Sequence, residues 1–117
     1  MKTTLLSLLV LAALVLPISH AYAQSQAEMN QEAYADFKNQ DVALNKVYQQ
    51  VLAKLDDEGQ AKLKTAQRAW VAFRDAQAEL AADLMRGGSA APLLRAGSLA
   101  ETTRARTRQL KEYLQGL

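Results

Sequence analysis

The residues of this chain that could do chemistry are a small set of carboxylate, amide and guanidinium groups. Asp41 and Asp75 could in principle support acid–base chemistry, and Arg74 stands directly before the second of them. No further base or nucleophile accompanies them, because the chain has no cysteine and its only histidine, His20, lies in an apolar leader. We therefore expect no catalytic site, no metal site and no cofactor.

These polar residues are better explained as a structural network between helices. If antiparallel helices turn near residues 56 and 89, Asp41 comes within reach of Arg74, and Asp75 comes beside Thr103. One buried or half-buried hydrogen-bond network would then fix the register of the helices. The alternative is that part of it lines a groove for a ligand. The expected network comprises Asp41, Asn45, Gln67, Arg74, Asp75, Thr103 and Arg106.

Three aromatic residues are predicted to lie in the core. Trp70 and Phe73 follow Leu63 and Ala66 at steps of 3, 4 and 3, which places all four on one stripe of an α-helix. Tyr48 continues the apolar spacing of the preceding helix in the same way. The alternative role, a platform for a ligand, is less common for such stripes.

The spacing of apolar residues predicts three helices and no strand, over about residues 27–55, over about residues 58–86 and from about residue 89 onward. Asp57 and Gln60 form a capping-box pattern for the second helix, and Gly87-Gly88 is expected to end it. Gly97-Ser98 could bend the third helix or split it. Short links imply antiparallel neighbours, so we predict an all-α, three-helix up-down-up bundle.

The first 23 residues have the pattern of a secretory signal peptide. Lys2 supplies a positive charge, residues 5–16 are apolar, and Ala21-Tyr22-Ala23 fits a cleavage site. Cleavage after Ala23 would leave one domain, residues 24–117, in the periplasm with no stable membrane anchor. Without Lys2 the domain has 13 basic and 12 acidic side chains, a net charge of about +1. This balance does not indicate a nucleic-acid partner.

Four separate stretches resemble the LprI family, which was formerly a domain of unknown function and is named for a lysozyme inhibitor. They are DVALNKVYQQVLAKL (residues 41–55), AQRAWVAFRD (residues 66–75), GGS (residues 87–89) and TRARTRQL (residues 103–110). The resemblance implies a small helical fold and a protein partner, with lysozyme as the named one. Many relatives carry cysteines at positions that correspond here to Glu32, Ala78 and Ser98, so this chain must hold its fold by packing alone.

We therefore expect an exported, non-enzymatic helical domain of the cell envelope that inhibits lysozyme-type muramidases. The partner-binding loop is predicted at Arg86, Gly87, Gly88 and Ser89, because glycines allow a close approach of the backbone. The alternative is a structural or stress-related envelope protein that binds another protein or a peptide. The sequence leaves the oligomeric state open, although Leu93 and Leu94 could support self-association.

Overall fold

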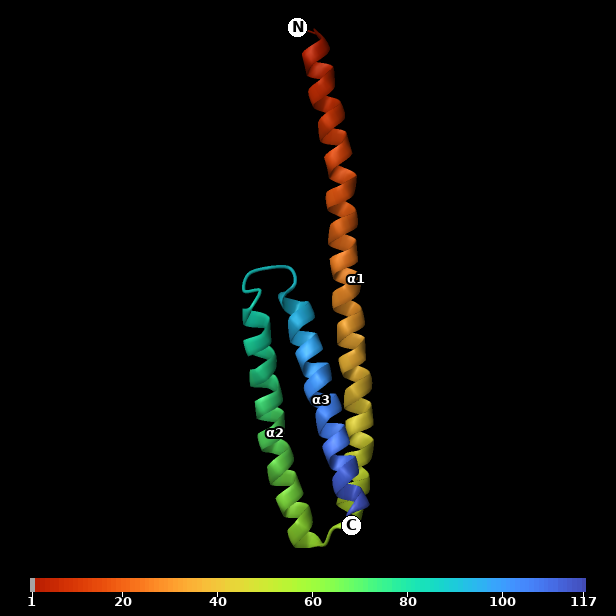
Figure 1. Ribbon diagram of the computed structural model, residues 1–117, viewed down its shortest axis with the longest axis vertical. Helices are drawn as coiled ribbons and strands as arrows, with labels where there is room; N and C mark the ends of the chain where they lie inside the picture. Colours follow the sequence, from red (N-terminus) through yellow and green to blue (C-terminus); the bar gives the residue numbers. More distant parts are fainter. Residues whose placement is uncertain (1) are drawn as a thin grey trace.

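The protein is a bundle of three helices and has no strand in the part of the chain that the structure describes. This computed structural model describes the backbone of residues 2–117 and the side chains of residues 21–23 and 25–117. The helices are α1 (Lys2–Lys54), α2 (Asp57–Asp83) and α3 (Ala91–Gln115). Successive helices run antiparallel (Figure 1). The predicted all-α, up-down-up architecture is therefore confirmed.

The middle position in the bundle belongs to α3. It packs against both α1 and α2, whereas α1 and α2 contact each other little. An open groove lies between the two outer helices over part of their length, and Arg74 of α2 reaches from one to the other.

The first helix is much longer than expected. It begins at Lys2 rather than near Ala27, and its red N-terminal part extends past the other two helices (Figure 1). This extension explains the long axis of 86 Å beside widths of 21 and 16 Å. Within the described part of the chain, no helix is long and apolar enough to cross a bilayer. The side chains of residues 1–20 lie outside those described, and cleavage after Ala23 stays a prediction.

The cap of α2 lies one residue before the predicted capping box. Asp56, not Asp57, has an extended backbone, and its Oδ1 accepts a hydrogen bond of 2.8 Å from the amide of Gly59. A side chain at Gly59 would bring its Cβ to 3.1 Å from that oxygen, so glycine permits this close approach. Gln60 does not complete the box, because its Nε2 donates to the carbonyls of Leu52 and Leu55 at the end of α1.

The link between α2 and α3 also differs from the prediction. The second helix ends at Asp83, three residues before the predicted end at Arg86. The chain then passes through a series of turns. Gly87 does adopt the left-handed conformation, with φ +75°, but it lies within these turns rather than directly behind the helix. The third helix starts at Ala91 and continues to Gln115 without interruption, so the expected split at Gly97-Ser98 is wrong.

Small side chains on α3 explain this continuity. Ala96 and Ala100 flank Gly97-Ser98 and are both buried against the neighbouring helices. Close packing on both sides of the dipeptide keeps the helix continuous, and Gly97 itself is exposed with open space where a Cβ would lie. Tertiary packing thus outweighs the weak helix propensity of glycine.

Large aliphatic residues gather at one end of the bundle, near the turn from α1 to α2. Tyr48 and Trp70 pack against this cluster and are only partly exposed. Toward the opposite end the buried apolar residues are mostly alanines, which let the helices approach closely. The cluster comprises Leu44, Val47, Val51, Leu63 and Leu110.

One predicted core residue lies on the surface. Phe73 is 57% exposed, because the buried face of α2 runs through Gln67, Trp70, Arg74 and Ala78 instead. The predicted buried face of α2 and the observed one both contain Leu63 and Trp70. They differ by a rotation of the helix about its axis. The observed one is favoured because Gln67 and Arg74 find partners on the other helices, while Ala78 allows tight contact.

Candidate functional site

A clamp centred on Arg74 joins α2 to α1. Its guanidinium carbon lies 5.4 Å from the ring centroid of Phe37 and 5.3 Å from that of Trp70. Its Nη1 lies 3.6 Å from Oδ1 of Asp41 on α1, and its Nε donates to Oδ1 of Asp75 at 2.9 Å. Only 14% of the side chain is exposed. The cation is therefore held by two aromatic faces and two carboxylates, across a gap that the helix backbones do not close.

A second polar pair joins α3 to α2. Arg106 donates from Nε to Oε1 of Gln67 at 3.0 Å, and from Nη1 to Oε1 of Gln109 on its own helix. Burial lowers the pKa of Arg106, since desolvation disfavours the charged form. The two glutamine oxygens compensate part of this cost, because each accepts a hydrogen bond from the cation.

The seven polar residues do not form the single network that the sequence suggested. Arg74, Asp41 and Asp75 make one cluster, and Arg106 with Gln67 makes another. Two of the seven stand apart. Asn45 is exposed on α1, and Thr103 is fully buried with a hydroxyl that has no hydrogen-bond partner among the described residues.

The register of α2 against α3 explains why Asp75 and Thr103 do not pair. Arg95 donates to Glu79 at 2.7 Å, so residues of the two helices face each other about one turn away from the expected alignment. Asp75 lines a surface hollow together with Leu99 instead. The expected pivot at residue 89 lies too late, because α2 ends three residues before the predicted position.

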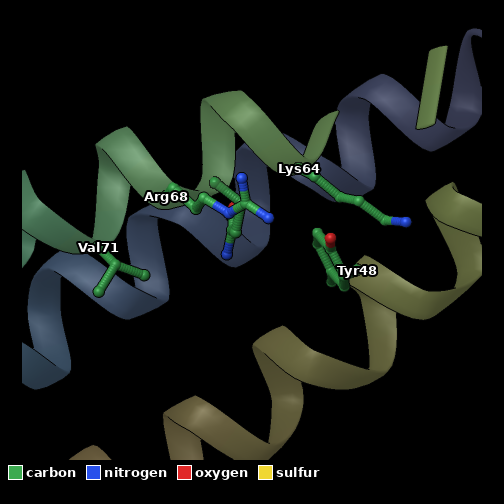
Figure 2. A pocket seen from close by; sticks show the side chains of 5 residues that line it. Tyr48, Lys64, Arg68 and Val71 are labelled. Carbon is green, nitrogen blue, oxygen red and sulfur yellow. The ribbon is translucent and has the colours of Figure 1, made fainter. Parts of the chain in front are cut away.

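An open groove of about 440 Å³ lies between α1 and α2, beside the Arg74 clamp. Its lining residues are Tyr48 from α1 and Lys64, Gln67, Arg68 and Val71 from α2. Tyr48 extends from α1 toward α2, where Lys64 and Arg68 lie (Figure 2). None of these lining residues is a carboxylate. The groove could accept an acidic or aromatic side chain of a partner, because its lining is cationic and aromatic.

The predicted binding loop is exposed at the end of the α2–α3 hairpin (Figure 1). Arg86 donates from Nε and Nη2 to the carboxylate of Asp83 at 2.7 and 2.8 Å, while 80% of its side chain remains exposed. This hydrogen bonding lowers the pKa of Asp83 and raises the pKa of Arg86. A Cβ on Gly88 would lie 3.1 Å from the carbonyl oxygen of Met85, so a larger residue would shift the turn.

Several residues of these surfaces were missed by the sequence analysis. Leu84 and Met85 add exposed apolar side chains beside the glycines of the loop. Phe37 forms one face of the Arg74 clamp, and Asp36 binds Arg104 of α3 at 3.1 Å. One signal was present, since Phe37 precedes Asp41 by four residues and therefore shares its helix face.

Comparisons with known proteins bear on this helical domain. A family model described as "Lysozyme inhibitor LprI" matches residues 19–110. An uncharacterized protein of Rhizobium meliloti (strain 1021) is 42% identical over 107 residues, which cover 80% of this chain and 77% of the relative. No solved structure matches.

Proposed function

Because this chain belongs to the LprI family, as its sequence predicted, we propose that it is an exported, non-enzymatic domain that inhibits a lysozyme-type muramidase. The family description supports an inhibitor that acts by binding a protein. The observation that carries the proposal beyond the family is the exposed loop at the end of the α2–α3 hairpin.

The loop has the chemistry to occupy a sugar-binding cleft. Muramidase clefts hold paired carboxylates that flank the bond to be cleaved. Arg86 can present its guanidinium to such carboxylates, because its present pair with Asp83 is exposed and such pairs contribute only about 0–1 kcal/mol. Leu84 is 81% exposed and Met85 47%, so both can bury apolar surface on the partner. Gly87 and Gly88 keep the tip of the loop narrow.

The export step of the proposal rests on the N-terminal sequence. Cleavage after Ala23 would release residues 24–117 into the periplasm, where a muramidase meets its peptidoglycan substrate. The mass of the chain purified from the cell envelope checks this step directly. A chain that still carries Lys2 would contradict it.

A lysis assay tests the inhibition. The processed chain, at micromolar excess over a lysozyme-type muramidase, should slow the clearing of a peptidoglycan suspension. Arg86→Ala and Leu84→Ala should each weaken the inhibition, whereas Arg108→Ala, at an exposed arginine on α3, should leave it unchanged. Undiminished lysis in the presence of the unaltered chain would remove the proposal.

The groove between α1 and α2 favours a second function, that of an envelope protein that binds another protein or a peptide. Its cationic and aromatic lining suits an acidic segment of a partner. A pull-down from envelope extract with the unaltered chain and with Tyr48→Ala distinguishes the two functions. A partner that is no muramidase, and that is lost with Tyr48→Ala but kept with Arg86→Ala, would support this second function.

A further inference from the structure

An exposed face of α2 carries a second apolar series, which we call the outer stripe. Its members are separated by steps of 3 and 4, the spacing by which one helix packs along another in a coiled coil. Phe73 is 57% exposed and Leu80 is 65% exposed, and the alanines of the series are exposed as well. The outer stripe comprises Ala66, Ala69, Phe73, Ala76 and Leu80.

We propose that the outer stripe binds a second copy of this chain, with the two α2 helices antiparallel about a two-fold axis. Such an axis brings the same surface together from both copies, so the surface must be complementary to itself. The charges along α2 meet this condition. Lys62 lies at the N-terminal end of the outer stripe, and Glu79 and Asp83 lie toward its C-terminal end.

Antiparallel packing brings these opposite charges together. Lys62 of one copy comes near the partner's Glu79 and the partner's Asp83, whereas parallel packing would place each charge beside its own counterpart. Each group now has a partner on its own chain, as Lys62 has in Glu58 at 2.9 Å. These pairs are exposed and hold the side chains only weakly, so they leave the charges available to a second copy.

The sizes of the side chains in the outer stripe select the register of the two antiparallel α2 helices. Phe73 packs on the partner's Ala69, and Ala66 faces the partner's Ala76, when the numbers of facing residues sum to about 142. A bulky ring then meets a small side chain, which lets the helices interdigitate. A shift by one heptad would bring Lys62 close to the partner's Arg86, and the two cations would repel each other.

The interface is small. The outer stripe spans about 21 Å at the rise of about 1.5 Å per residue of an α-helix. Stable interfaces bury roughly 1,200–2,000 Å² in total, and one pair of helices of this length falls near or below the lower end of that range. We therefore expect a reversible dimer that assembles at micromolar concentrations. The inference does not rest on muramidase inhibition, because the outer stripe and the loop are different surfaces.

Sedimentation equilibrium tests the dimer with the chain as the cell delivers it, purified from the envelope. Over roughly 5–500 μM the mean mass should rise from that of one chain toward that of two. Phe73→Glu should remain monomeric with unchanged helix content. Val42→Glu, at a 71% exposed apolar residue of α1, is the matched control and should dimerise like the unaltered chain. A monomer at every concentration, or a Phe73→Glu chain that dimerises equally well, would overturn the inference.

Single cysteines test the orientation, because the chain has none of its own. Residue 72 lies beside the proposed axis, on the flank of the outer stripe, so a short bismaleimide should cross-link two copies of Ala72→Cys. It should not cross-link Ala66→Cys, because the two introduced residues would lie about 15 Å apart along the helices. Efficient cross-linking through Ala66→Cys would show parallel helices and would refute the antiparallel dimer.

Discussion

At the scale of single residues, Arg74 is the most connected polar side chain among those that the structure describes. It spans the gap between the outer helices through Phe37 and Asp41 on α1, with Trp70 and Asp75 on its own helix. The planar guanidinium can stack between two rings and still donate at its edge, which an ammonium group cannot do. Its role is therefore best described as a structural clamp that keeps α1 beside α2.

This geometry makes Arg74→Lys a sensitive substitution. We expect it to lower the free energy of unfolding by about 1–2 kcal/mol, because lysine loses one stacking contact and the bond to Asp75. Urea unfolding of the purified chain measures the change. Arg68→Lys is the matched control at an exposed arginine of the same helix, and it should stay within about 0.5 kcal/mol. Equal effects for the two variants would mean that the clamp does not stabilise the fold.

Thr103 allows a test in which the substitution should not lower the free energy of unfolding. Its hydroxyl is buried without a hydrogen-bond partner among the described residues, so Thr103→Val removes a desolvated polar group and keeps the shape. We expect Thr103→Val to be neutral or to stabilise the fold by up to about 1 kcal/mol. Thr107→Val should instead destabilise it slightly, because the Thr107 hydroxyl donates to the Thr103 carbonyl at 3.0 Å. A clear loss of stability in Thr103→Val would indicate that the hydroxyl does have a partner in solution.

At the scale of the elements, the number and order of the helices could be predicted, but the face of α2 could not. The series through Leu63, Ala66 and Phe73 and the series through Leu63, Gln67 and Arg74 have almost the same helical spacing. Hydropathy favours the first, because it cannot anticipate that Arg74 will find two rings and two carboxylates on folding. The predicted pairing of Asp41 with Arg74 needed only the position of the short turn near residue 56. The predicted register of α3 on α2 needed the position at which α2 ends, and the glycines at residues 87 and 88 suggest an end that is too late in the sequence.

The start of α2 offers a direct comparison of sequence pattern and structure. We expect Asp56→Ala to cost about 1 kcal/mol, because it removes the bond to the Gly59 amide. Asp57→Ala, at the residue that the capping-box pattern selects, should cost less than half as much, since only a favourable charge near the helix start is lost. Thermal or urea unfolding of the two variants measures the difference. The reverse order would favour the capping-box prediction over the observed cap.

At the scale of the whole molecule, the bundle is stabilised unevenly along its length. The large aliphatic residues gather near the α1–α2 turn, while the end that carries the α2–α3 loop is packed with alanines, which bury little apolar surface. Exposed ion pairs such as Arg95–Glu79 add little there. The surface proposed for binding a muramidase is therefore attached to the weaker end of the protein, where a loop can adjust to a partner at small cost.

This unevenness predicts a gradient of amide hydrogen exchange. Amides near Val51 and Leu63 should exchange only through global unfolding, whereas those near Ala82 and Ala96 should exchange through smaller openings that separate the ends of α2 and α3. Val51→Ala, in a side chain with no exposed surface, should lower the protection of the first group by about 2 kcal/mol and affect the second group less. Exchange measured by NMR in increasing urea resolves the two groups. Uniform protection along the bundle would show that the alanine-rich end is as stable as the aliphatic core, and adjustment of the loop would then have to occur within the turn residues alone.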